Sequence, residues 1–352
     1  MQRLAVTSWA RIPQSLRVVL RGFGGEVYQG GGSGGQQGSN VQQMPLPPAE
    51  LATAPAPAPP RPIPHQQQQQ RAEARRRRRV AGRVRAAHSA VRHPGIHVGF
   101  INVCGMTQVK AGELSQAVHA LGLDVLGVAE TWEGRCRIAD IAGYTFIGKP
   151  RQGGQGGGVG FFVNTVLTPI IIPHTNTALP ESLWLEFAAR HRGGRCLFLG
   201  VVYLPTSALA TVDGAIATYA QLQADIQGFQ QRGDTIIVGD FNSRVGSARA
   251  AGERIGQYGE NELDAAGRAF RDVLQVTDTS CLNGRIAHRD AHGCCVPEFT
   301  RIRQMSSAAG VSEQCAVLDY FVVPSQWVST DVCRLHVDPV WKPQGADHVL
   351  LW

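Results

Sequence analysis

The stretch with the clearest chemical potential is a short apolar run that ends in two polar side chains, Asp240 and Asn242. Residues two apart in an extended chain point the same way, so both side chains would lie at the carboxyl end of a strand at 235–238. A carboxylate beside a neutral amide suits a site that holds a water or a metal ion together with a phosphate oxygen. A lone Asp-x-Asn is more often a hydrogen-bonded turn, so its meaning depends on the rest of the chain.

Similar polar residues follow the other apolar runs, each at the point where the run stops. The whole set comprises Asn102, Glu130, Tyr203, Asp240, Asn242, Asp319, Asp347 and His348. Such an oxygen-rich set suits Mg²⁺ or Mn²⁺. Cleavage of a phosphodiester needs an in-line water, neutralised phosphate charge and a stabilised leaving oxygen, and these side chains could supply all three. Spacing alone does not show that they converge.

The apolar runs that separate these residues have the periodicity of strands and helices, in the alternation typical of an α/β protein. A glycine-rich stretch at 153–160 lacks the Lys-Ser/Thr ending of a phosphate-binding loop and is interpreted as a mobile loop before a strand. Strands are predicted at 97–102, 125–129, 159–163, 183–187, 196–203, 235–238 and 318–324, helices at 113–121, 212–230 and 262–274, and irregular structure at 277–316.

Residues 1–95 differ in composition from the rest and are predicted to be a disordered low-complexity tail. They contain 14 Lys+Arg and 3 Asp+Glu, a balance of +11, whereas residues 96–352 contain 20 and 24, a balance of −4. The arginine-rich segment 71–85 indicates nuclear import or phosphate-backbone contact, with a solvated tract as the alternative. Residues 1–25 resemble an organelle transit peptide, but a plain disordered leader or a gene-model artefact would look the same.

The sequence gives little support for a membrane protein or for a protein built around disulfides or a zinc site. No apolar run approaches the 18 residues of a membrane-spanning helix, so no membrane association is expected. The eight cysteines are expected to be reduced thiols, and the adjacent pair Cys294 and Cys295 matches no standard zinc-site spacing.

The order of the motifs resembles the endonuclease/exonuclease/phosphatase superfamily. The motifs are Ile-Asn-Val at 101–103, Ala-Glu-Thr at 129–131, Val-Tyr-Leu-Pro at 202–205, Gly-Asp-Phe-Asn at 239–242, Leu-Asp-Tyr at 318–320 and Asp-His at 347–348. Within that superfamily, residues 239–246 with 255–259 are similar to the apurinic/apyrimidinic-type endonuclease domains of non-LTR retrotransposons and their craniofacial-development-protein-like relatives. The resemblance covers about residues 97–352 and implies a four-layer α/β sandwich with two central mixed sheets flanked by helices.

The resemblance also implies a role for each site residue. Glu130 would be the principal Mg²⁺ (or Mn²⁺) ligand, with Asn102 beside it and Asp347 completing the metal environment. Asp240 would orient or deprotonate the attacking water, while Asn242 and Tyr203 would hold the scissile phosphate. His348, oriented by Asp319, would donate to a phosphate oxygen, and Thr300 would be a further phosphate contact.

The function expected from this resemblance is a Mg²⁺-dependent DNA endonuclease. The enzyme would act as a monomer, bind DNA through its phosphate backbone and nick one strand, leaving 3′-hydroxyl and 5′-phosphate ends. The alternatives are a phosphoesterase acting on RNA, a phosphoinositide or another small phosphate ester, and a catalytically inactive binding module; the intact site counts against the last.

Two features depart from the family pattern. Relatives carry Asn-Gly where this chain has Ala-Ala-Gly at 265–267, and the cysteine-rich segment 281–316 is longer than expected.

Overall fold

The computed structural model describes the carboxyl-terminal part of the chain, in which residues 95–352 group into one compact unit. The predicted disordered tail, the arginine-rich segment 71–85 and the transit-peptide-like segment 1–25 lie outside the described residues. The described ranges are 96–133, 138–153, 156–187, 195–248, 253–289, 294–307, 310–328, 334–338 and 341–352.

The first sheet has four strands in the order β1-β2-β4-β3. β1 (Val98–Asn102) and β2 (Val125–Ala129) are parallel and are joined by helix α2 (Gln108–Leu121). β4 (Val159–Asn164) pairs antiparallel with both β2 and β3 (Tyr144–Lys149), so the sheet is mixed. Every residue of β1 and β2 is buried, as expected for strands that read as continuous apolar runs.

The second sheet has six strands in the order β5-β6-β7-β8-β14-β9. Only β7 and β8 pair in parallel, and the other neighbours are antiparallel. The parallel pair is connected by helix α3 (Val212–Gln230). The strands are β5 (Ile171–His174), β6 (Ser182–Phe187), β7 (Cys196–Tyr203), β8 (Gly233–Asp240), β14 (Asp319–Pro324) and β9 (Thr279–Cys281).

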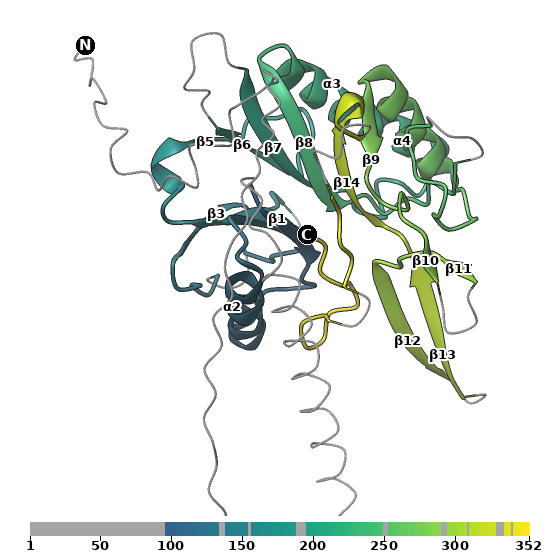
Figure 1. Cartoon of the computed structure of the whole chain (residues 1–352), viewed down its shortest axis with the longest axis horizontal. Coiled ribbons are helices and arrows are strands. Elements are labelled where there is room, and N and C mark those ends of the chain that lie inside the picture. The colour runs from purple at the N-terminus through teal and green to yellow at the C-terminus, as the bar shows by residue number, and fades with distance from the viewer. Residues whose placement is uncertain are drawn as a thin grey trace, which may run out of the picture. The chain divides into compact units, whose positions relative to one another are not determined.

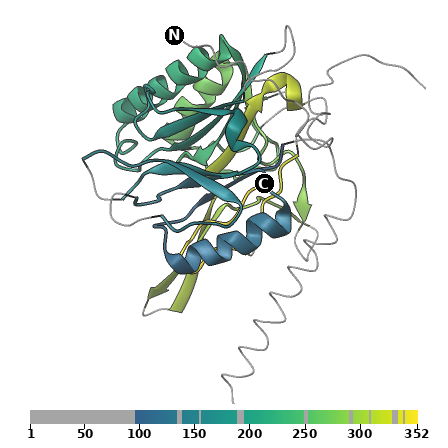
Figure 2. The same ribbon diagram turned by 90° about the vertical axis from the view of Figure 1, so that its left-hand side faces the viewer.

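The two sheets pack face to face, with β1 and β2 against β7 and β8. Helix α2 covers the outer face of the four-stranded sheet, and α3 with α4 (Ala265–Val276) covers the six-stranded sheet, as Figures 1 and 2 show. The result is the predicted four-layer α/β sandwich. Among the described residues, no helix is both long enough and apolar enough to cross a membrane.

Two helices begin at a capping side chain rather than at the predicted position. Thr107 accepts a hydrogen bond from the Lys110 amide, so α2 begins five residues earlier than predicted. Asp264 accepts from the Gly267 amide at 2.6 Å and starts α4. Gly267 has a packing role, since a Cβ there would lie 1.9 Å from the Arg244 carbonyl oxygen.

The prediction of irregular structure over 277–316 was wrong. The segment contains β9, the short pair β10 (His288–Arg289) and β11 (Cys295–Val296), and the hairpin β12 (Arg301–Ser307) and β13 (Gly310–Ala316). The hairpin extends away from the two sheets (Figure 1). The sequence did not predict the hairpin because a β-ribbon exposed to solvent lacks the apolar alternation that marks a half-buried strand.

Candidate active site

Three of the predicted residues lie in one row across the six-stranded sheet. Tyr203 on β7 and Asp319 on β14 both pair in register with Asp240 on β8. Residues directly opposite on neighbouring strands direct their side chains to the same face, so the row brings all three groups to one edge of the sandwich.

Asn102 connects this row to the four-stranded sheet. It ends β1, it is fully buried, and its Nδ2 donates to Asp240 Oδ2 and to Glu130 Oε1, both at 2.8 Å. Glu130 follows β2 with a positive φ of 52°, a strained backbone conformation for a non-glycine residue. The two sheets therefore meet at a hydrogen-bonded network of one amide and two carboxylates.

The end of the chain brings Asp347 and His348 to the same edge. The Leu351 and Phe100 backbones exchange two hydrogen bonds, which fasten the terminal segment to β1. The Val349 amide donates to the Thr300 carbonyl at 2.8 Å, and the Ile302 amide donates to the Asp347 carbonyl at 2.7 Å. The segment is thus held between β1 and the beginning of β12.

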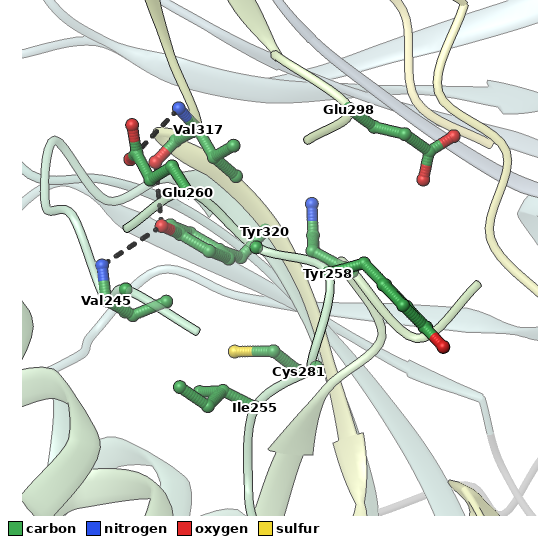
Figure 3. A pocket seen from close by; sticks show the side chains of 13 residues that line it. Val245, Ile255, Tyr258, Glu260, Cys281, Glu298, Val317 and Tyr320 are labelled. Atoms are coloured by element: carbon green, nitrogen blue, oxygen red, sulfur yellow. Dashed lines mark hydrogen bonds between the residues drawn. The ribbon is translucent and has the colours of Figure 1, made fainter. Parts of the chain in front are cut away.

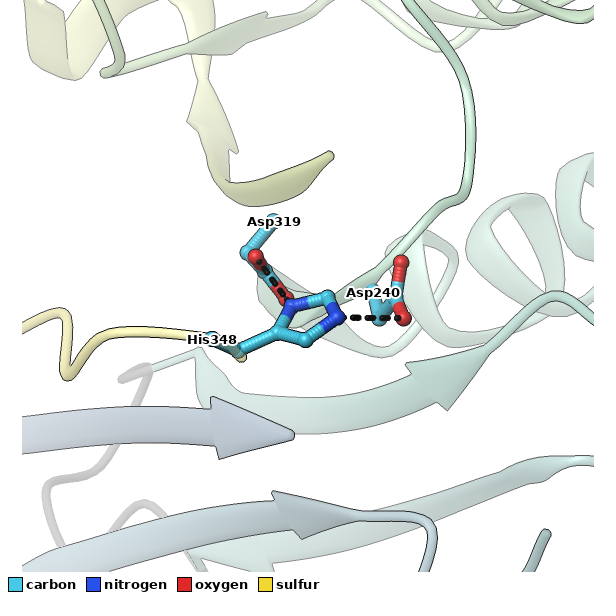
Figure 4. Close-up of side chains that lie close together, drawn as sticks. All are labelled: Asp240, Asp319 and His348. Carbon is cyan, nitrogen blue, oxygen red and sulfur yellow. Dashed lines mark hydrogen bonds and ion pairs between the residues drawn. The ribbon is translucent and has the colours of Figure 1, made fainter. Parts of the chain in front are cut away.

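His348 and Asp319 form a buried dyad. His348 Nδ1 lies 2.8 Å from Asp319 Oδ2, and its Nε2 faces Asp240 Oδ2 at 3.9 Å (Figure 4). Burial disfavours the imidazolium, but the carboxylates of Asp319, Asp240 and Asp347 together outweigh that effect and raise the pKa of His348 to about 9. Thr300 supports the dyad, because its buried hydroxyl accepts from the Asp319 amide at 3.0 Å.

Asp240 has the ionisation behaviour of a general base. Burial, reinforced by the nearby Asp319 charge, raises the pKa of Asp240 to about 7, although bonds from Asn102 and the Asn242 amide favour its charged form. A carboxylate of this pKa is a far stronger base than an ordinary aspartate and still ionises near neutrality.

Asn242 and Tyr203 flank Asp240. Asn242 adopts a positive φ of 44°, and its Nδ2 donates to the Leu204 carbonyl at 2.9 Å. Burial, together with the charges of Glu130 and Asp240, raises the pKa of the Tyr203 phenol, so this group remains a hydrogen-bond donor at any working pH.

Asp347 contacts two residues that the sequence analysis did not assign to the site. Arg301 Nε donates to Asp347 Oδ2 at 2.9 Å, and the Cys104 thiol donates to Oδ1 at 3.3 Å. Burial would favour the protonated acid, but His348 and then Arg301 hold the pKa of Asp347 below its usual value. Burial, followed by the charges of Asp347 and Glu130, raises the pKa of the Cys104 thiol to about 12, so the thiol stays neutral.

Two sets of side chains at this edge carry donor atoms of the kind that bind divalent cations. Asp240, Asp319 and His348 offer ligand atoms within 4.8 Å of one another, but the positive imidazolium there opposes a second cation. The second set consists of Asp347, which accepts a hydrogen bond from Cys104, and Glu130, which accepts one from Asn102. Carboxylate and amide oxygens are the ligands that hard divalent cations prefer.

A separate small cavity lies under the loop that follows β8. Its volume is about 10 Å³, no larger than one water. The Tyr320 hydroxyl donates to the Val317 carbonyl and accepts from the Val245 amide, and Glu260 accepts from the Val317 amide (Figure 3). These bonds fix the loop that carries Asn242.

Hydrogen bonds and ion pairs within 4 Å thus link seven of the eight predicted residues into one group. The eighth, Tyr203, lies opposite Asp240 on the neighbouring strand. Sequence reasoning missed Cys104, Arg301 and the pair Arg151–Glu181 beside Tyr203. The available signal for Arg151 was a charged residue two positions before a glycine-rich run.

Comparison with solved structures agrees with the fold. An AP endonuclease from Leishmania major superposes with a TM-score of 0.52 at 15% identity, covering 73% of this chain and 86% of that one. The catalytic domain of Xenopus laevis APE2 superposes with a TM-score of 0.50 at 14% identity, covering 72% and 90%. No curated protein matches in sequence. Residues 100–348 match the model of the Endonuclease/Exonuclease/phosphatase family, and the chain belongs to that family.

Proposed function

We propose that the chain is a metal-dependent phosphodiester hydrolase, and specifically a DNA endonuclease that nicks one strand by in-line attack of water. The observation that supports this proposal most directly is the buried hydrogen-bond network. In it Asn102 donates to both Asp240 and Glu130, while the His348–Asp319 dyad faces Asp240. A base, a charged donor and a cation-binding carboxylate are the parts that phosphodiester hydrolysis needs.

Asp240 acts as the base in this proposal. Its carboxylate orients a water and takes a proton from it, and the Asn102 and Asn242 bonds hold the acceptor oxygens in place. Asn102 and Asn242 remain uncharged at every pH, so they direct the carboxylate without competing for the proton.

His348 and Tyr203 act as the donors. The imidazolium, oriented through Nδ1 by Asp319, presents Nε2–H to a phosphoryl oxygen whose negative charge grows as the water attacks. The Tyr203 phenol donates a neutral hydrogen bond to the same phosphate.

Glu130 and Asp347 would hold the cation, Mg²⁺ or Mn²⁺, with Asn102 beside Glu130. When bound, it neutralises phosphate charge and stabilises the leaving oxygen as a Lewis acid. The Arg301 ion pair lowers the charge that Asp347 offers the cation, so Glu130 is the stronger ligand of the two.

The retrotransposon-type assignment rests on the segment after Asp240. Arg244 pairs with Glu260 at 3.0 Å and with Glu262 at 2.5 Å, and so fastens residues 239–246 to the segment that follows 255–259. Both motif segments of the proposed subtype therefore form one unit next to the catalytic base.

A substrate panel tests the proposal. The full chain is incubated with Mg²⁺ and supercoiled plasmid, with single-stranded RNA, or with bis(p-nitrophenyl) phosphate. Conversion of plasmid to relaxed circles with 3′-hydroxyl and 5′-phosphate ends is expected. Turnover of RNA or the small ester without plasmid nicking would replace the DNA endonuclease with a phosphoesterase, and no turnover by folded protein would leave a binding module.

A further inference from the structure

Arg151 lies beside the active site in a position that the catalytic roles above leave unexplained. Its Cζ is 5.5 Å from the centroid of the Tyr203 ring, in the geometry of a cation–π contact. The residue belongs to the connection between β3 and β4, two residues before the glycine-rich stretch.

The glycine-rich stretch provides a flat surface for the Arg151 guanidinium. Gly156, Gly157 and Gly158 all have positive φ values, between 65° and 84°. A Cβ on Gly157 would lie 2.3 Å from Arg151 Nε, so only glycine permits this approach. The Thr131 and Trp132 amides donate to the Gly158 and Gly157 carbonyls, which attaches the stretch to the segment after Glu130.

Glu181 fixes the direction of the guanidinium. Its Oε1 is hydrogen-bonded to Arg151 Nε, and its Oε2 accepts from the Gly158 amide at 2.8 Å. The Glu181 carbonyl accepts from the Tyr203 amide at 2.9 Å. One buried acid therefore ties the arginine, the glycine-rich stretch and the catalytic tyrosine together.

The guanidinium keeps donors that the protein does not use. Arg151 Nη2 is buried without a hydrogen-bond partner among the described residues, although the side chain as a whole is 23% exposed. A buried donor of this kind calls for a partner. The Thr131 hydroxyl, next to Gly158, is in the same situation.

We propose that Arg151 binds a backbone phosphate of the nucleic acid, adjacent to the phosphate that Tyr203 contacts. An arginine fixed through Nε holds its guanidinium plane in one orientation, and its charge and remaining N–H donors are complementary to a phosphate oxygen. The proposal rests on the proposed function in that it needs a polyanionic phosphodiester substrate.

Arg232 offers a matched control. It also pairs with an acid, Glu186, and its Cζ lies 5.0 Å from the centroid of an aromatic ring, Phe198. It follows α3 next to the beginning of β8, at the end of the strand opposite to Asp240. Its removal deletes the same charge and the same kind of contacts far from the site.

The test is the salt dependence of DNA binding, measured by fluorescence anisotropy. The full-length wild type, Arg151→Ala, Arg151→Lys and Arg232→Ala bind a short fluorescein-labelled duplex in EDTA over a series of KCl concentrations. Each phosphate contact contributes about 0.9 to the slope of log K against log [salt]. Arg151→Ala should therefore reduce the slope by about 0.9, while Arg232→Ala and the charge-conserving Arg151→Lys keep it.

An unchanged slope for folded Arg151→Ala would overturn the proposal, as would equal reductions in Arg151→Ala and Arg232→Ala. If circular dichroism shows that Arg151→Ala does not fold, Arg151→Lys decides. Weaker DNA binding by Arg151→Lys at an unchanged slope supports a contact that needs the guanidinium. Unchanged DNA binding overturns the proposal. EDTA prevents hydrolysis, so the result is independent of cleavage. A chain that binds through Arg151 and cleaves no plasmid would refute only the proposed function.

Discussion

His348 Nδ1 lies 2.8 Å from Asp319 Oδ2, and both side chains are almost completely buried. A buried carboxylate beside an imidazole fixes the tautomer and orientation of the ring and stabilises its charged form. In the proposed mechanism the remaining Nε2–H is the group that donates to substrate. Asp319 is then a positioning residue whose effect on the reaction passes through His348.

Replacing Asp319 with asparagine should lower the activity and leave the fold intact. The amide keeps the shape but loses the charge that stabilises the imidazolium, and donor catalysis of this kind contributes about 10²–10⁴-fold. We expect kcat to fall within that range with little change in KM. The control is Asp234→Asn, which removes the acid paired with Arg195 at the other end of β8. Equal kcat for both variants would contradict the role given to the dyad.

The activity should depend on pH in a bell shape. Asp240 must be ionised and has a pKa of about 7, so the rate rises as pH increases through that value. His348 must be protonated and has a pKa of about 9, so the rate falls above it. A bound cation favours the ionised carboxylate, so the acid limb should move to lower pH as Mg²⁺ is increased.

The measurement is kcat/KM against pH at several Mg²⁺ concentrations, for the wild type and for His348→Gln. The variant should lose the alkaline limb and keep the acid limb. Retention of the alkaline limb in the variant would assign it to a different group.

Removing Arg301 should strengthen cation binding. Its Nε pairs with Asp347 Oδ2, and both side chains are partly exposed, at 28% and 24%. Ion pairs of this kind are worth about 0.2–1 kcal/mol, so Arg301→Ala should lower the half-saturating Mg²⁺ concentration by up to about fivefold. Arg303→Ala, two residues along β12, is the control. A higher Mg²⁺ requirement in Arg301→Ala alone would show that Arg301 supports the site instead of competing with the cation.

Two glycine-to-alanine changes in helices should act in opposite directions. Gly267→Ala places a Cβ 1.9 Å from the Arg244 carbonyl oxygen and should destabilise the fold by about 1–3 kcal/mol. Gly228→Ala in α3 has no atom within 4 Å of the new Cβ and should stabilise by about 0.4–1 kcal/mol. Urea unfolding of both variants tests this, and similar midpoints would contradict the close approach at Gly267.

Much of the site could be predicted because its residues end buried strands. Apolar runs before Asn102, Glu130 and Asp240 are local signals, and parallel strands direct their carboxyl ends to one edge. The register that aligns Asp319 with Asp240 is not local, because β14 is antiparallel to β8 and nearly 80 residues separate the two acids.

The ion pairs Arg301–Asp347 and Arg151–Glu181 were not predictable for a related reason. Each joins side chains from separate elements. Their pairing depends on side-chain geometry, which the periodicity of apolar residues in the sequence does not reveal. The hairpin β12–β13 was missed because its strands are polar on both faces.

The most direct test of the account is nicking of supercoiled plasmid by the full chain, with Mg²⁺ or EDTA. Glu130→Gln and His348→Gln remove the proposed cation ligand and donor, and His174→Gln is the control because His174 also pairs with a carboxylate, Glu186. We expect Mg²⁺-dependent relaxed circles from the wild type and His174→Gln, and a loss of at least about 10²-fold in the other two. Equal nicking by all four proteins, or nicking that persists in EDTA, would contradict the assignment of the active site.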